Sequence, residues 1–137
     1  MSDEIAGTCA CGAVRFTSQA EPLIQLFCHC RDCQQATGAA FARTAFFRLK
    51  ASHITGALAA RPFVAASGSK TTREACAACG TLMFDRSERF PALVGVMAER
   101  LSRPFVFRPS CHVWVRSQRQ DTVISDGLPQ HAEDFTG

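Results

Sequence analysis

Two short stretches set the framework of this chain: Cys9-Ala10-Cys11-Gly12 and Cys76-Ala77-Ala78-Cys79-Gly80. Residues two apart on a strand share a face about 7 Å apart, and a glycine allows the curl that brings them closer. In the C-x-x-C-G turn, backbone amides after the first cysteine can point at its sulfur. The four cysteines come from the two ends of a long loop. They predict one tetrahedral structural zinc site, with buried free thiols or disulfides as the alternatives.

A third group of cysteines lies between them, in Cys28-His29-Cys30-Arg31-Asp32-Cys33. Three thiols within six residues can reach one metal ion and leave its fourth position open for water or substrate, as in catalytic zinc sites. The sequence therefore predicts a second, more labile metal site or a thiol-reactive site at Cys28, Cys30 and Cys33. A redox C-x-x-C pair (Cys30 and Cys33) and a second structural site completed elsewhere are the alternatives.

The remaining cysteine and the histidines have weaker assignments. Cys111 is expected to be a small buried hydrophobe rather than a ligand. His29 lies between two ligands and should face away from them on an extended strand, although a role as a ligand or proton donor stays open. His112 is either a satisfied core histidine or a site residue. His53 and His131 are expected to be solvated.

Length and composition favour one ordinary globular domain over residues 1–137. The chain is 47% hydrophobic and 20% charged, and no repeat or low-complexity tract interrupts it. The small, polar residues 65–72 are only long enough for a loop. No apolar run approaches the roughly 20 residues that span a bilayer, and the acidic residues 1–4 do not resemble a secretory signal. These features predict a soluble, cytoplasmic protein without a membrane partner, and in a reducing compartment clustered cysteines favour metal binding.

The net charge of +3 counts every thiol as neutral. Seven thiolates holding two Zn²⁺ would bring it to zero, and the arginines are scattered along the chain. Nucleic-acid binding is therefore not expected.

The hydrophobic pattern predicts a mainly β fold. Short alternating or apolar runs separated by Pro, Gly or charged turns indicate strands. One helical turn is expected over residues 32–37, capped by Asp32 and ended by Gly38. The expected strands cover residues 13–17, 23–27, 41–49, 81–84, 93–97, 105–107 and 113–115.

These motifs, in this order, resemble the glutathione-dependent formaldehyde-activating (GFA) family, also called the CENP-V/GFA domain. The resemblance spans about residues 7–129. It rests on the three cysteine motifs and on two later segments, Pro109-Ser110-Cys111-His112-Val113-Trp114-Val115 and Asp126-Gly127-Leu128-Pro129.

The resemblance implies a small zinc-stabilised domain of two twisted antiparallel sheets with at most short helical turns. It implies two zinc ions per chain. One is structural, on Cys9, Cys11, Cys76 and Cys79; the other is catalytic, on Cys28, Cys30 and Cys33. Because the second site has only three local ligands, its zinc is expected to be held less firmly and can be partly occupied. The implied activity is that of a carbon–sulfur lyase acting on thiol adducts of small aldehydes, of the S-hydroxymethylglutathione type, with glutathione as the thiol partner. A non-catalytic zinc-binding module for protein interaction is the alternative, and it predicts an exposed apolar patch.

Overall fold

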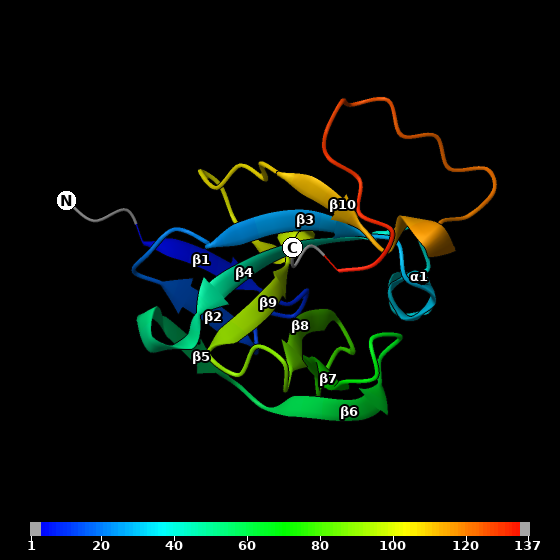
Figure 1. The fold of residues 1–137 in the computed structure, drawn as a ribbon. Coiled ribbons are helices and arrows are strands. Elements are labelled where there is room, and N and C mark those ends of the chain that lie inside the picture. Colours follow the sequence, from blue (N-terminus) through cyan, green and yellow to red (C-terminus); the bar gives the residue numbers. More distant parts are fainter. Residues whose placement is uncertain (1–3, 135–137) are drawn as a thin grey trace.

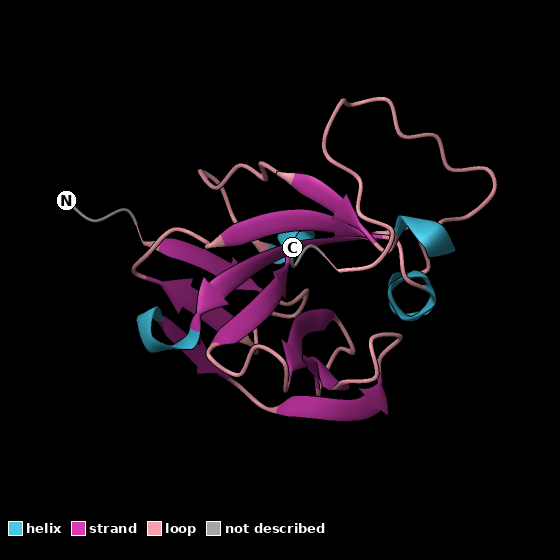
Figure 2. Ribbon diagram, in the orientation of Figure 1, coloured by secondary structure: helices cyan, strands magenta, loops and turns pink. Residues whose placement is uncertain are grey.

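The fold is mainly β and is built from two sheets (Figures 1 and 2). The computed structural model describes residues 4–134, so the expectation for the N-terminal residues lies largely outside the described part. Within it, the only α-helix is α1 (Arg31–Thr37), and three single 3₁₀ turns cover Leu49–Ala51, Ala98–Arg100 and Val115–Ser117. The strands are β1 (Ile5–Thr8), β2 (Arg15–Ser18), β3 (Ile24–Cys28), β4 (Ala42–Arg48), β5 (Ser52–Thr55), β6 (Leu58–Val64), β7 (Lys70–Cys76), β8 (Leu82–Ser87), β9 (Leu93–Met97) and β10 (Cys111–Val113).

The smaller sheet has the order β1-β2-β5 and the larger one β10-β3-β4-β9-β8-β7-β6. All pairings are antiparallel except that of β10 with β3, which is parallel. The expectation of antiparallel sheets therefore holds for all but this edge strand. Antiparallel neighbours need only short turns, whereas β10 is reached through a long connection from β9. No helix within residues 4–134 is long and apolar enough to cross a membrane.

The main core lies between the two sheets. Phe16 of β2 packs against Phe47 of β4 and Phe84 of β8, with ring centroids 5.0 and 6.0 Å apart. Cys9 and Cys76 belong to the same buried cluster. The core of the protein is thus continuous with one of the cysteine groups.

Side-chain alternation along β4 separates this core from a second face. Ala45 and Phe47 point into the core, whereas Thr44 and Phe46 line a pocket on the other side. This is the period of two expected for a strand covered on both faces. The pocket is therefore formed on the face of the larger sheet that the smaller sheet leaves open.

Three local expectations are wrong. The strand expected over residues 113–115 ends at Val113, because Trp114 adopts the left-handed conformation (φ 57°) and a 3₁₀ turn follows. Residues 105–107 form no strand, because the Phe105 amide bonds Ser102 in a turn and the Phe105 ring packs on Phe47 from a loop. The cap of α1 is Cys30 rather than Asp32: the Cys30 sulfur accepts the Cys33 amide at 3.2 Å. The helix does end at Gly38, which adopts the left-handed conformation (φ 70°).

Candidate metal centres and their pocket

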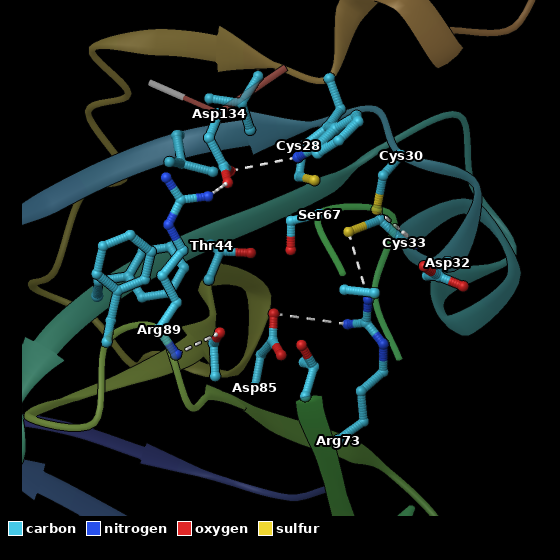
Figure 3. A pocket seen from close by; sticks show the side chains of 18 of the residues that line it. Cys28, Cys30, Asp32, Cys33, Thr44, Ser67, Arg73, Asp85, Arg89 and Asp134 are labelled. Atoms are coloured by element: carbon cyan, nitrogen blue, oxygen red, sulfur yellow. Dashed lines mark hydrogen bonds and ion pairs between the residues drawn. The ribbon is translucent and has the colours of Figure 1, made fainter. Parts of the chain in front are cut away.

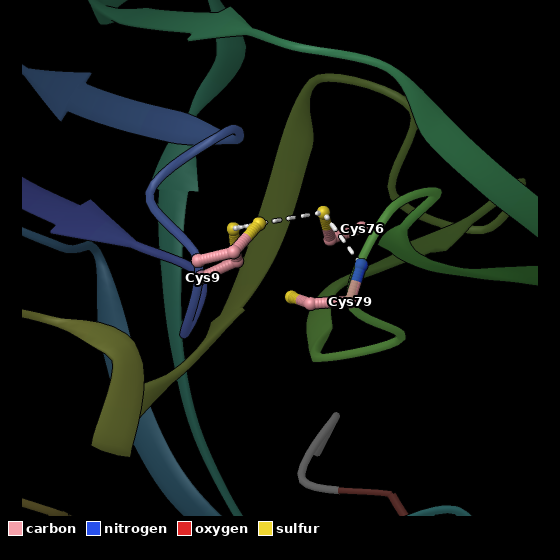
Figure 4. A group of neighbouring side chains, drawn as sticks. Cys9, Cys76 and Cys79 are labelled. Atoms are coloured by element: carbon pink, nitrogen blue, oxygen red, sulfur yellow. Dashed lines mark hydrogen bonds between the residues drawn. The ribbon is translucent and has the colours of Figure 1, made fainter.

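The first group, here called the four-cysteine cluster, consists of Cys9, Cys11, Cys76 and Cys79. Figure 4 shows the turn between β1 and β2 facing the turn between β7 and β8 across this cluster. All four sulfur atoms lie within 4.8 Å of one another. The distances from Cys11 Sγ to Cys9 Sγ and Cys76 Sγ are 3.6 and 3.8 Å. A tetrahedral zinc with Zn–S bonds of about 2.3 Å requires sulfur separations of about 3.8 Å, so this donor set fits zinc.

Backbone amides and two glycines shape both halves of the four-cysteine cluster. The Val14 amide donates to Cys9 Sγ at 3.3 Å, and the Cys79 amide donates to Cys76 Sγ at 3.4 Å. Gly12 and Gly80 close the two turns with φ angles of 80° and 76°. These are the roles that the sequence predicts for the C-x-C-G and C-x-x-C-G motifs. Amide donors also stabilise the thiolate form that a metal ion requires.

Thr81 bridges the two halves of the four-cysteine cluster, a role that sequence reasoning missed. Its hydroxyl accepts the Ala10 amide at 3.2 Å and lies 3.0 Å from Cys79 Sγ. This hydroxyl contact lowers the pKa of the Cys79 thiol to about 5. The polar residue after C-x-x-C-G is the signal that was available.

The second group, here called the three-cysteine cluster, consists of Cys28, Cys30 and Cys33, again with sulfurs within 4.8 Å of one another. Cys28 ends β3, Cys30 caps α1 and Cys33 lies in its first turn. Among residues 4–134, no fourth Cys, His, Asp or Glu atom joins this group. The structure thus offers three local ligands and a fourth side that opens on the pocket.

The protonation of the three-cysteine cluster suits a cation. Hydrogen bonds from the Cys28 and Cys33 thiols lower the pKa of Cys30 to about 3, while the bond to Cys30 raises the pKa of Cys28. One sulfur therefore carries the charge while its neighbours keep their protons. A bound cation would favour release of those protons as well. All eight cysteines are free thiols in the structure, with no Cys30–Cys33 disulfide.

The pocket beside the three-cysteine cluster combines apolar and charged walls (Figure 3). Phe46, Phe63 and Trp114 contribute apolar surface, and the cavity volume is about 110 Å³. At its rim, the Asp134 carboxylate accepts hydrogen bonds from Arg89 and from the Trp114 ring nitrogen. Sequence reasoning missed these rim residues, since they come from segments far apart in the chain.

Two charged pocket residues, Arg73 of β7 and Asp85 of β8, were also missed. Arg73 Nη2 donates to Cys33 Sγ at 3.4 Å, and Arg73 Nη1 lies 3.8 Å from an Asp85 oxygen. Both side chains are largely buried. Both strands carry other polar and charged residues, so nothing in the sequence singled out this pair.

The buried histidines form a chain on the side of β3 away from the sulfurs. His29 Nε2 lies 2.8 Å from His112 Nδ1, and His112 Nε2 lies 2.7 Å from an Asp126 oxygen. Because the carboxylate only accepts, His112 Nε2 donates to Asp126. Burial, followed by the influence of His112, lowers the pKa of His29 to about 4, so His29 is neutral at pH 7. His112 is thus a satisfied core histidine, and Cys111 lies in an apolar cluster as expected.

We expect His112→Phe to lower the free energy of unfolding by about 1–3 kcal/mol, the usual cost of a buried group left without its hydrogen bond. Phenylalanine retains the stacking on Phe27, whose ring centroid is 4.6 Å from that of His112, but leaves the buried His29 Nε2 without its hydrogen-bond partner. The matched control is His53→Phe at an exposed position on β5, expected to change stability little. Urea denaturation would measure both. Equal stabilities for the two variants would refute a stabilising role of the histidine chain.

The comparisons with known proteins agree with this arrangement. The family model described as glutathione-dependent formaldehyde-activating enzyme (GFA) matches residues 4–117. A crystal structure of a Rhodobacter sphaeroides protein, solved as a Northeast Structural Genomics target, is 26% identical with a TM-score of 0.52. The similarity covers 73% of this chain and 90% of that one. No curated protein matches the chain. Because the family model covers most of its length, the chain belongs to the GFA family.

Proposed function

We propose that the protein is a zinc-dependent carbon–sulfur lyase that interconverts a small aldehyde and its thiol adduct, with glutathione and formaldehyde as the reactants. The observation that carries this proposal is the three-cysteine cluster on the wall of a partly apolar pocket, without a fourth protein ligand among the described residues. A site with three protein ligands leaves one position for a substrate. The family description supports the choice of thiol and aldehyde.

The two cysteine groups would have different roles, one structural and one catalytic. Cys9, Cys11, Cys76 and Cys79 would hold a structural zinc between the two sheets, whereas Cys28, Cys30 and Cys33 would hold the catalytic one. When bound there, zinc supplies a Lewis acid that favours the thiolate form of a thiol in its open position. The protein side chains orient that thiol and exclude water.

The reaction needs neither an oxidant nor a reductant. The thiol sulfur forms a bond to the carbonyl carbon, the C=O double bond becomes a C–OH single bond, and the thiol proton ends on that oxygen. The reverse direction breaks the same C–S bond. The apolar residues Phe46, Phe63 and Trp114 limit the water around the reacting atoms, which strengthens electrostatic interactions inside the pocket.

The alternative of a non-catalytic interaction module predicts an exposed apolar patch. Among residues 4–134, the large exposed hydrophobic residues are instead single positions on four different segments, at Leu23, Val64, Val106 and Val123. Scattered residues of this kind are normal on a soluble protein surface. The pocket beside the three-cysteine cluster therefore favours the enzyme.

The proposal is tested by NMR exchange spectroscopy on an equilibrium mixture of glutathione, formaldehyde and their adduct. Zinc-loaded protein should accelerate the exchange in a way that saturates with glutathione. Cys28→Ser should lose about 100-fold or more of this acceleration, because metal activation contributes several kcal/mol. Cys111→Ser, which alters a buried thiol outside both clusters, should retain it. Absence of acceleration by fully metal-loaded protein would refute the proposed activity.

A further inference from the structure

Arg73 and Asp85 form an unusual ion pair inside the pocket. They face each other in the register of β7 and β8, and their side chains are only 7% and 19% exposed. The shortest distance, 3.8 Å from Arg73 Nη1 to Asp85 Oδ2, exceeds a hydrogen bond. Arg73 Nη1 and Asp85 Oδ1 are buried without a hydrogen-bond partner among the described residues. A buried pair normally needs close geometry and full hydrogen bonding to offset the cost of desolvation, so this pair is not explained by stability.

The position of this pair connects it to the proposed reaction. The Arg73 guanidinium lies between the Cys33 sulfur and the Asp85 carboxylate, and Asp85 lines the same pocket as the three cysteines (Figure 3). The other carboxylates of the pocket are placed differently. Asp134 is engaged by Arg89 and the Trp114 ring, and Asp32 lies in the first turn of α1. Asp85 is thus the carboxylate that combines burial, an unsatisfied oxygen and a place in the same pocket as the cysteines.

The net charge of the site indicates that Asp85 takes up a proton when a thiol binds. Three thiolates, one Zn²⁺, Arg73 and an ionised Asp85 together carry one net negative charge. A neutral thiol that binds as a thiolate adds a second negative charge unless its proton stays in the site. Concentrated like charges in a poorly solvated pocket are unfavourable. A carboxylate that takes up the proton keeps the total unchanged.

We propose that Asp85 is the acid–base residue of the reaction and that Arg73 positions it. The Asp85 carboxylate accepts the proton that the thiol loses on binding. It then returns this proton to the carbonyl oxygen as the C–S bond forms, so that thiol and aldehyde give the adduct with all atoms and electrons balanced. In the reverse direction, Asp85 takes the hydroxyl proton and delivers it to the departing sulfur. This inference rests on the function proposed above.

The surroundings of Asp85 support this task. Burial raises the pKa of Asp85 above its ordinary value even though Arg73 opposes the rise. Cys30 and Asp32 add to the increase, whereas β4 and β9 bring only uncharged residues, Thr44, Phe46 and Gly95, to this part of the site. A raised pKa moves a carboxyl group toward the range in which it both accepts and donates a proton.

Calorimetry of glutathione binding to the zinc-loaded protein tests the proposal, in two buffers of different ionisation enthalpy at pH 7. Free glutathione is a protonated thiol at this pH. Wild-type protein should bind it with almost no proton released to the buffer, because Asp85 retains the proton. Asp85→Asn should release about one proton per glutathione bound, as expected when a thiol binds a metal as a thiolate. Asp121→Asn, the same change in an exposed ion pair with Arg119, should behave as wild type.

Asp85→Asn should also lower the exchange rate by about 10²–10⁴-fold, the usual contribution of a general acid–base residue. The wild-type rate should rise with pH through the pKa of Asp85 and then level off, since the carboxylate is the active form. Asp85→Glu keeps a carboxylate, so it should recover part of the rate that Asp85→Asn loses, together with the dependence of the rate on pH. If Asp85 had only a structural role, the rate of the wild type would not follow the ionisation of this carboxylate.

The wild-type measurement alone is decisive if Asp85→Asn fails to fold. Release of a full proton to the buffer by the wild type would overturn the role of Asp85 while leaving the lyase intact. Absence of glutathione binding to any form would instead refute the function on which the inference rests.

Discussion

Cys76→Ser should unfold or precipitate the protein under conditions in which the wild type is stable. Cys76 is 2% exposed, and it belongs both to the four-cysteine cluster and to the main core. The binding free energy of a structural zinc is also folding free energy, about 10–16 kcal/mol in small zinc domains. That is as large as the whole stability of an ordinary domain, about 5–15 kcal/mol. Serine leaves only three thiolates and a poor fourth ligand, so most of this contribution is lost.

The matched control is Cys111→Ser. Cys111 is also buried, at 5% exposure, in an apolar cluster with Leu26 and Val113. It belongs to neither cysteine cluster. The same substitution there buries a hydroxyl without removing a metal ligand and should cost only about 1–3 kcal/mol. Thermal denaturation and metal analysis of protein purified without chelator would compare the two. Equal losses in both variants, with unchanged metal content, would contradict a structural metal at the four-cysteine cluster.

The hydrophobic pattern of the sequence predicted the strands that are apolar and buried. The predicted strand 93–97 coincides with β9 (Leu93–Met97), a continuous apolar run in the centre of the larger sheet. The strand β6 was not expected, because it is largely exposed, contains Pro62 and forms the edge of the sheet. Residues 105–107 have strand-like side chains but lie between Pro104 and Pro109, and Phe105 is held by packing rather than by a ladder. A buried aromatic side chain in this segment therefore does not require its backbone to pair with a strand.

Each local cysteine motif could be recognised from the sequence, because ligands two or three residues apart are close whatever the wider fold. The two halves of the four-cysteine cluster were joined because a structural zinc takes four ligands and each half supplies two. The Arg73–Asp85 pair could not be recognised in this way. The pairing of Ala75 with Leu82, extended along the two strands, would place Arg73 opposite Phe84. A bulge between Glu74 and Ala75 shifts the register, and Arg73 instead faces Asp85. A one-residue bulge of this kind has no clear sequence signal, yet it determines which side chains meet in the pocket.

Cys30→Ser should remove one metal equivalent and leave the fold intact. Cys30 has two roles: it is a ligand candidate of the three-cysteine cluster, and its sulfur caps α1 by accepting the Cys33 amide. Serine is a good N-cap but a poor zinc ligand, so it retains the second role and abolishes the first. Cys30→Ala loses both and should be about 1 kcal/mol less stable than the serine variant. Comparing the two variants separates capping from metal binding.

The same reasoning predicts how the wild type would lose its proposed metals. A zinc ion in the four-cysteine cluster would join segments far apart in the sequence, so it should leave only when the domain opens. A zinc ion in the three-cysteine cluster would have local ligands and a side open to the pocket, so a mild chelator should remove about one equivalent with the fold retained. Circular dichroism and metal analysis would follow this step, and calorimetry should show glutathione binding more than tenfold weaker to Cys30→Ser than to loaded wild type, about 1.4 kcal/mol. If both metals left in one step with unfolding, and no form bound glutathione, the three-cysteine cluster would be a structural site. The interaction module would then be the better account of the protein, because a thiol could reach no exchangeable position on either metal.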